Sequence, residues 1–238
     1  MPAERREGMD HEHHEWSPIS TRGKLSWPNN ARVALCVIIT LEHTEWEAPE
    51  GSFSADQAGG LGLRPFPDYP RFSHREYGHR VGIFRVLDTL QRLNIKATVA
   101  MDTQTAEGYP YLVKHCQDRG CEIIAHGVSG TQMISGQMST EEGADFIRSS
   151  LDALKKATGS APRGWFGTDY GESERTPGLL RQAGIDYLCD WVNDEQPYPM
   201  ANGLTALPTM LEMDDWFALS NRRVEIERYC QAMRDGFD

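Results

Sequence analysis

The feature that most constrains the fold is the stretch from Ala31 to Glu47, ARVALCVIITLEHTEWE, in which an apolar run ends abruptly at ionisable residues. The run from Val33 to Leu41 is short and almost unbroken, which is typical of a strand buried on both faces of a parallel sheet covered by helices. Glu42 and His43 follow it directly. Because ligands bind at the carboxyl ends of strands in parallel α/β proteins, this boundary predicts both a buried strand and the place of a functional site.

Five further strand patterns alternate with helical patterns along the chain, which predicts βαβ units and a parallel sheet. One helix is predicted to open at Ser139, where a capping box places Glu142 three residues after the serine. Polar residues stand at the end of strand after strand, so we expect a (β/α) barrel with its site at one rim rather than an open doubly wound sheet. No GxGxxG motif follows the first strand and no P-loop motif occurs, so a nucleotide-binding fold is unsupported. The predicted strands are residues 33–41, 95–101, 121–125, 164–166, 185–189 and 204–207.

The length and charge of the chain narrow its class. It has 238 residues and a formal net charge of -11, which fits one acidic globular domain and argues against nucleic acid or a membrane surface as partner. No apolar run approaches the ~20 residues that span a bilayer, and no secretion signal is recognisable. We therefore expect a cytoplasmic protein that acts on a small molecule. Residues 1–30 are polar and predict an N-terminal arm, and residues 31–238 predict a single barrel domain.

Ionisable groups stand at several predicted strand ends, and at one rim they would form a hydrolytic constellation. Glu42 is suited to act as general base toward water or as an oxygen ligand. His43 and His126 are suited to coordinate a divalent ion such as Zn²⁺, which needs about three protein ligands and an open position for water. Arg163 and Asp190 are suited to form an ion pair that orients a catalytic group. A structural histidine at a strand end and a structural ion pair are the alternative interpretations of the same residues.

Two motifs carry a resemblance to a known family. They are the runs 163–167, RGWFG, and 189–200, CDWVNDEQPYPM. These runs resemble the polysaccharide deacetylase family, in its allantoinase-like and cyclic-imidase-like branch, and the match extends from about Trp16 to the last residue. The resemblance implies a distorted (β/α) barrel. It also implies hydrolysis of C–N bonds other than peptide bonds, such as N-acetyl groups on sugars or ring amides in ureides and imides.

The resemblance implies roles for the first two strand ends. Glu42 and His43 stand where the family's first motif has two adjacent Asp residues, a base and then a metal ligand. His126 stands at the first of two histidine positions four residues apart, and Gly130 stands at the second. Because Gly130 supplies no side chain, we expect any divalent metal such as Zn²⁺ to be held weakly, with His43 and His126 as its only nitrogen ligands. We also expect Glu42 and His126 to lie on neighbouring strand ends, within ~6 Å of each other, since adjacent strands are about 4.8 Å apart.

The resemblance further places Arg163 at the arginine of the third motif and Asp190 at the aspartate of the fourth. We therefore expect these two residues to contact each other and to act with Glu42 in catalysis. The remaining residues of the predicted site are those expected to bind the substrate. They are Trp46, Trp165, Trp191, Asp194 and Glu212.

Two function classes remain open at this stage. The first is a hydrolase of a small amide, ureide or cyclic imide, or of an N-acetyl group on a carbohydrate. The second is a catalytically impaired barrel that binds a small ligand, or a truncated pseudo-enzyme. Members of the family continue with a last strand that bears a functional histidine, and no histidine follows Glu212. The resemblance thus predicts a barrel without its last strand or strands, whose open edges make a homo-oligomer an expectation.

Overall fold

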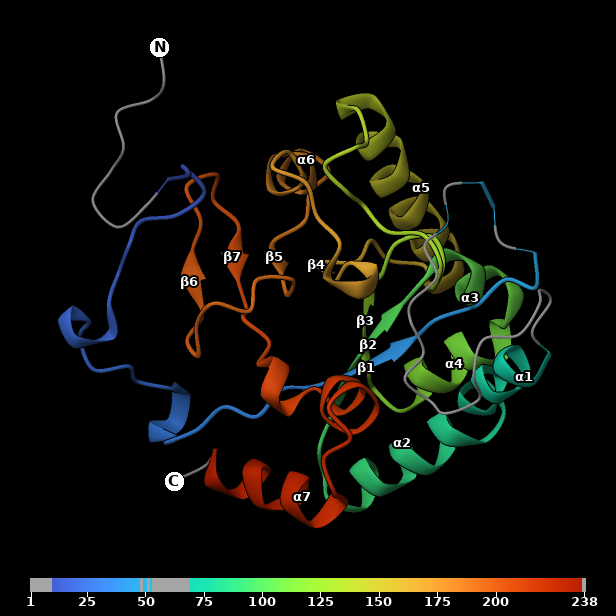
Figure 1. Ribbon diagram of the computed structural model, residues 1–238, viewed down its shortest axis with the longest axis horizontal. Helices are drawn as coiled ribbons and strands as arrows, with labels where there is room; N and C mark the ends of the chain where they lie inside the picture. Colours follow the sequence, from blue (N-terminus) through green and yellow to red (C-terminus); the bar gives the residue numbers. More distant parts are fainter. Residues whose placement is uncertain (1–9, 48, 51, 53–68, 237–238) are drawn as a thin grey trace.

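One sheet organises the computed structural model, which describes residues 10–47, 49–50, 52 and 69–236 (Figure 1). Its strand order is β1-β2-β3-β4-β5-β7-β6. Every pair from β1 to β7 is parallel, and β6 joins β7 in the antiparallel direction. The α/β class and the parallel sheet predicted from the alternating pattern are therefore confirmed. The strands are β1 (Val37–Leu41), β2 (Ala97–Met101), β3 (Glu122–Ala125), β4 (Gly164–Trp165), β5 (Tyr187–Leu188), β6 (Tyr198–Pro199) and β7 (Thr205–Ala206).

Helices connect successive strands and cover the sheet. The predicted capping box begins α5, where the Ser139 hydroxyl accepts a hydrogen bond from the Glu142 N–H at 3.2 Å and the Glu142 carboxylate accepts one from the Ser139 N–H at 2.7 Å. The same helix stops at Gly159, whose φ of 82° is the left-handed conformation that glycine adopts without strain. The α-helices are α1 (Tyr69–Tyr77), α2 (Ile83–Arg92), α3 (Thr103–Gly108), α4 (Pro110–Asp118), α5 (Thr140–Thr158), α6 (Thr176–Gln182) and α7 (Ile226–Asp235).

Alternate residues of the central strands bury two opposite faces. In β2, Val99 and Met101 belong to the large cluster that also contains the buried side chains of the surrounding helices. Ala100, between them, belongs to a second cluster with Ile124 of β3, which is its partner in the strand register. The period of two along a strand explains this division. The unbroken apolar character of these runs thus follows from burial on both faces.

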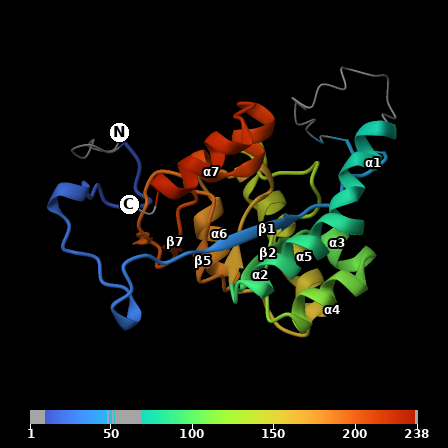
Figure 2. The same cartoon turned by 90° about the horizontal axis from the view of Figure 1, so that it is seen from below.

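The sheet has two edges within the described residues, formed by β1 and β6, and no pairing there closes it into a complete barrel. The extended segment that leads from the N-terminal arm into β1 runs along one edge (Figure 2). Val33 and Leu35 in this segment are 45% and 53% exposed, so the prediction that the strand begins at residue 33 was wrong. Their backbone has no neighbouring strand, and β1 begins at Val37, where β2 becomes available.

Two further elements are not among those expected from the sequence. Helix α1 begins at Tyr69, and a π-helical turn at Gly78–Gly82 joins it to α2. Strand β6 was not predicted, because two residues that include a proline carry no periodic pattern. The described residues contain no helix long and apolar enough to cross a membrane.

Candidate active site at the strand ends

Glu42 and His126 form the centre of the candidate site. Glu42 directly follows β1, His126 directly follows β3, and the His126 Nε2 atom lies 2.9 Å from Glu42 Oε1. The predicted proximity of these two side chains is therefore confirmed. We had expected the two residues to follow neighbouring strands, and this part of the prediction was wrong, because β2 lies between β1 and β3. His126 is 1% exposed, whereas the Glu42 side chain keeps 21% of its surface accessible, so Glu42 is the member of the pair that solvent and substrate reach.

The hydrogen bond of the second ring nitrogen of His126 bears on the protonation of His126 and Glu42. Nδ1 donates a hydrogen bond to the Phe166 carbonyl oxygen, which only accepts, so Nδ1 carries a proton. Burial alone would lower the pKa of His126, but its hydrogen bond with Glu42 and the charge of Glu42 raise that pKa overall. Burial alone would raise the pKa of Glu42, but the hydrogen bond and the charge of His126 lower it overall. Each group thus favours the charged form of the other, an imidazolium at His126 and a carboxylate at Glu42.

Asp102 directly follows β2 and is a member of the rim that the sequence analysis missed. It is fully buried, and its carboxyl oxygens accept hydrogen bonds from the His43 N–H and the Thr105 N–H, both at 2.6 Å. Burial raises the pKa of Asp102 to about 7, and these two backbone bonds oppose the rise. Asp102 thus ties the loop after β1 to the start of α3. It comes directly after a predicted strand, so the rule that selected Glu42 and His126 also identifies it.

The His43 side chain lies beside Tyr109, with 5.9 Å between the ring centroids. The His43 Nδ1 atom lies 3.4 Å from the Tyr109 hydroxyl. The ring of Tyr109 also stacks with the ring of His79, with 4.8 Å between their centroids. His79 itself makes a 3.2 Å hydrogen bond with the Thr105 hydroxyl. The side chain of His43 is thus part of a polar aromatic cluster beside α3 and α4.

The residues present do not fit a catalytic zinc ion. Among residues 10–47, 49–50, 52 and 69–236, no group of three or more His, Cys, Asp or Glu side chains is placed to hold a metal. A Cβ atom at Gly130 would lie 3.1 Å from Glu42 Cβ and 3.2 Å from the His43 carbonyl oxygen, so a side chain at this position meets the loop after β1. The weak binding of a metal by His43 and His126 stays a prediction, and we derive no step of the reaction through a metal.

Asp190 pairs with a carboxyl group rather than with an arginine. It follows β5, is 7% exposed, and its Oδ1 accepts a 2.6 Å hydrogen bond from the Gly167 N–H. Glu172 accepts a 3.0 Å hydrogen bond from the Trp191 indole through Oε2. The other oxygen of each carboxyl group is buried and lacks a donor. Burial and the charge of Glu172 raise the pKa of Asp190, and burial raises the pKa of Glu172 to about 7, so the two groups share a proton.

The predicted contact between Arg163 and Asp190 was wrong. Arg163 precedes β4 and therefore lies at the amino end of that strand, whereas Asp190 follows the carboxyl end of β5. The Arg163 side chain is 73% exposed and its Nε donates a 2.8 Å hydrogen bond to Asp186. Trp165, expected to bind substrate, is fully buried in the hydrophobic core. A residue before a strand and a residue after it lie at opposite ends of the sheet, which places Arg163 away from the rim.

The N-terminal arm covers two other predicted substrate-binding residues. Arg22 binds Asp194 through two hydrogen bonds, of 2.8 Å and 2.5 Å, so Asp194 fastens the arm. Three histidine rings of the arm pack on Trp191, with ring centroids 5.3–5.8 Å from it. Trp191 reaches the site indirectly, because its indole N–H holds Glu172. The three histidines are His11, His13 and His14.

The last two predicted substrate-binding residues lie nearer the surface. Trp46 is 37% exposed and packs against the rings of Tyr69 and Phe72, each at 5.2 Å. Glu212 is exposed in a short 3-10 helix after β7. Asp214, two residues further on, is the acidic group that contacts the rim, where it accepts a 2.7 Å hydrogen bond from the Tyr170 hydroxyl.

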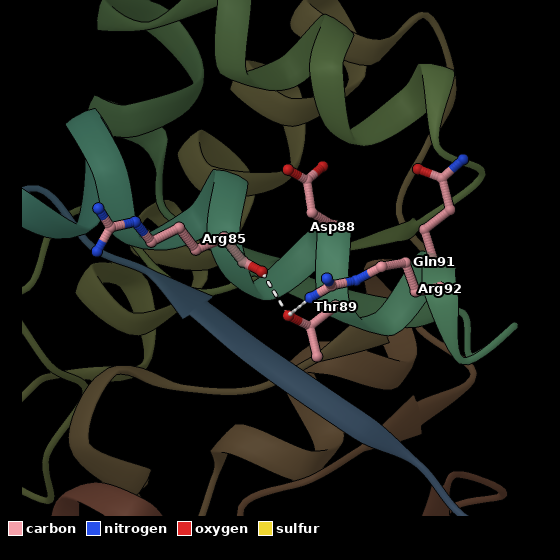
Figure 3. A pocket seen from close by; sticks show the side chains of 5 residues that line it. All are labelled: Arg85, Asp88, Thr89, Gln91 and Arg92. Atoms are coloured by element: carbon pink, nitrogen blue, oxygen red, sulfur yellow. Dashed lines mark hydrogen bonds between the residues drawn. The ribbon is translucent and has the colours of Figure 1, made fainter.

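A polar hollow of about 680 Å³ lies away from this rim. Figure 3 shows that one helix, α2, supplies all five lining side chains. Within it the Arg92 guanidinium donates a 3.0 Å hydrogen bond to the Thr89 hydroxyl, which in turn donates a 2.9 Å bond to the Arg85 carbonyl oxygen. The hollow includes neither Glu42 nor His126, and its polar groups bond one another, Tyr77 or Arg119, so we assign the site to the strand ends.

The structure is thus a parallel α/β sheet with ionisable groups at the carboxyl ends of its strands. Residues 76–188 match the profile of the polysaccharide deacetylase family. The solved structure of PuuE allantoinase has the same fold, with a TM-score of 0.75 at 21% identity over 89% of this chain and 73% of that one. The fold class and the family resemblance predicted from the sequence are thus confirmed.

Two proteins that are similar to this chain in sequence are named as deacetylases. A predicted polysaccharide deacetylase of Schizosaccharomyces pombe is 28% identical over 253 residues, which cover 93% of this chain and 76% of that protein. The peptidoglycan deacetylase of Helicobacter pylori is 29% identical over 174 residues, which cover 71% of this chain and 59% of that protein. The chain thus spans three quarters of the first relative and less than two thirds of the second.

Proposed function

We propose that this chain hydrolyses a C–N bond other than a peptide bond, with the N-acetyl group of a carbohydrate as the leading substrate class. The observation that carries the proposal is the pair of Glu42 and His126. Both ring nitrogens of His126 are engaged, so this histidine orients Glu42 and keeps it ionised, while Glu42 retains accessible surface. A carboxylate held in this way is suited to take a proton from water.

In the proposed reaction, Glu42, His126 and Arg75 have different roles. The Glu42 carboxylate accepts a proton from a water molecule as the water oxygen bonds to the carbonyl carbon of the substrate. His126 stays hydrogen-bonded to Glu42 throughout and is a positioning residue. Collapse of the tetrahedral intermediate breaks the C–N bond, and the nitrogen leaves with a proton. Arg75, whose Nη1 lies 3.4 Å from Glu42 Oε2, adds positive charge beside Glu42 and so favours its ionised form.

The substrate class rests on sequence similarity. The two relatives at 28% and 29% identity are named as deacetylases, whereas the likeness to allantoinase is one of fold. Small amides, ureides and cyclic imides therefore form the second group of substrates to test. A barrel that binds a ligand without hydrolysing it is the competing function, and the absence of a three-donor metal group in the described residues favours it.

The test is whether the purified protein hydrolyses N-acetylglucosamine oligomers, peptidoglycan, allantoin or a cyclic imide. The release of acetate, amine or ureide would be measured. Glu42→Gln keeps the shape of the side chain and removes the base, so we expect a loss of kcat on the order of 10²–10⁴-fold. Glu45→Gln is the matched control, because Glu45 lies in the same loop but is bonded to Thr131 and Gln132 instead. Activity that survives Glu42→Gln, or binding without turnover in the wild type, would contradict the proposal.

A further inference from the structure

We propose that Cys116 and Cys121 are an oxidisable pair of thiols, which hydrogen peroxide converts into a disulfide. Both cysteines are reduced in this structure. Cys116 belongs to α4, and Cys121 directly precedes β3. His126 follows the other end of β3, so the two thiols lie away from the rim and their chemistry is independent of the proposed hydrolysis.

The end of α4 brings these two residues together. The N–H of Gly120 bonds the Gln117 carbonyl oxygen at 2.9 Å, and the N–H of Cys121 bonds the Cys116 carbonyl oxygen at 3.1 Å. Gly120 has a φ of 69°, in the left-handed region that glycine adopts without strain. These two bonds around a left-handed glycine define a Schellman motif, in which the residues at the positions of Cys116 and Cys121 commonly pack their side chains together. The backbone therefore fixes the approach of the two cysteines.

The two thiols are in contact and differ in exposure. A side-chain hydrogen bond joins Cys116 to Cys121. Cys116 is 0% exposed and lies in the hydrophobic core, whereas Cys121 is only half-buried. Two sulfur atoms in hydrogen-bond contact are already close to the separation from which a disulfide forms, so little movement of the backbone is needed. Cys121 is thus the thiol that a small oxidant reaches, and Cys116 is the thiol that reacts with Cys121 next.

The surroundings of Cys121 favour its thiolate. The hydrogen bond from the Cys116 thiol lowers the pKa of Cys121 to about 7, although burial opposes this change. A hydrogen bond with the backbone of Ala97 and the charge of Arg119 contribute to the lower pKa. The Arg119 guanidinium is itself held by two 2.6 Å hydrogen bonds to side chains of α2. The thiol–thiol hydrogen bond also raises the pKa of Cys116, so one sulfur is the nucleophile and the other keeps its proton.

The oxidation proceeds in two balanced steps. The Cys121 thiolate attacks one oxygen of hydrogen peroxide, the O–O bond breaks, and the departing hydroxide takes up the proton that the thiol had lost and becomes water. Cys121 is then a sulfenic acid. The Cys116 sulfur attacks the Cys121 sulfur, the S–O bond breaks, and the Cys116 proton leaves with the hydroxyl group as a second water molecule. The two thiols together lose two electrons, which reduce one peroxide molecule to two water molecules.

Peptide mapping tests the disulfide directly, because trypsin cuts after Arg119 and so separates the two cysteines. Cys116 falls in the peptide 115–119 and Cys121 in the peptide 120–148. The purified protein would be treated with hydrogen peroxide, its remaining thiols blocked with N-ethylmaleimide, and the tryptic digest examined by mass spectrometry. We expect the two peptides to appear linked, at their summed mass less two hydrogen atoms, and to separate after reduction with dithiothreitol. Peroxide that oxidises the exposed Cys36 or Cys230 while both Cys116 and Cys121 stay reduced would overturn the inference.

Two variants and one wild-type measurement separate the steps. In Cys116→Ala the second step is removed, so dimedone should trap the sulfenic acid on Cys121. Cys230→Ser is the matched control, an exposed cysteine of α7 whose loss should leave the linked peptides unchanged. In the wild type, which needs no substitution, the rate of Cys121 alkylation by iodoacetamide should reach half its maximum near pH 7. A half-maximum at or above about 8.5, the pKa of an ordinary thiol, would show that Cys121 is not activated and would overturn the inference.

Discussion

The substitution Glu172→Gln is expected to change the pH dependence of folding stability. Glu172 and Asp190 face each other in a buried part of the rim, and each has a buried oxygen without a donor. A shared proton satisfies both oxygens. A glutamine at position 172 replaces this proton with an amide N–H that does not titrate, and it keeps an oxygen for the Trp191 indole, which now bonds Glu172 at 3.0 Å.

The size of the change in folding stability follows from the pKa of Glu172, which burial raises from the ordinary value of 4.5 to about 7. One pKa unit corresponds to about 1.4 kcal/mol, so ionising Glu172 in the folded protein costs roughly 3 kcal/mol. Because the folded state holds the proton more tightly than the unfolded state, this contribution to stability is full below pH 4.5. It is lost as the pH rises through about 7. The variant lacks this loss, so it should be more stable than the wild type at pH 8 by roughly 2–3 kcal/mol.

The assay is urea unfolding at pH 5 and pH 8, followed by far-UV circular dichroism because Trp191 fluorescence would respond to the substitution itself. The matched control is Glu174→Gln, an exposed glutamate two residues away, which should not alter the pH dependence. A wild type whose free energy of unfolding does not fall between pH 5 and pH 8 would refute the shared proton. So would a Glu172→Gln variant that is less stable than the wild type at both values.

Three further predictions concern the arm, the loop after β1 and the catalytic pair. Arg22→Ala removes both hydrogen bonds to Asp194, so limited proteolysis should cut the arm several-fold faster, while the thermal midpoint of the domain stays within about 2 °C. Gly130→Ala places a Cβ atom 3.1 Å from Glu42 Cβ, which should cost roughly 1–3 kcal/mol in urea unfolding and lower kcat. His126→Asn removes the partner that lowers the pKa of Glu42, so the acid limb of the pH–rate profile should move to higher pH.

The parts of the fold that were predictable are those in which burial imposes a pattern. Strands β2 and β3 are buried on both faces, and their unbroken apolar runs follow from that. The rule that chemistry gathers where such runs stop led to Glu42 and His126, which the structure brings within 2.9 Å of each other. The same rule applied without exception selects Asp102, which directly follows β2.

What was not predictable depends on contacts between distant parts of the chain. Asp194 meets Arg22 across 172 positions of sequence, and nothing local to either residue marks this pair. Glu172 lies in an irregular segment between β4 and α6, so no periodicity places its side chain beside Asp190. Arg163 is a different case. The residue type was suitable, but a strand of two residues leaves its ends ambiguous in the sequence, and Arg163 falls on the amino side.

The position of Arg163 also accounts for the carboxyl pair. In the family pattern an arginine stands opposite the fourth-motif aspartate, and a guanidinium with a carboxylate is a neutral unit. Here the partner of Asp190 is Glu172. These two carboxyl groups are neutral only when both are protonated, and with one shared proton they carry one negative charge. Together with the ionised Glu42, compensated by His126, this gives a rim whose charge becomes more negative as the pH rises through about 7. Such a rim repels anionic molecules more strongly as the pH rises.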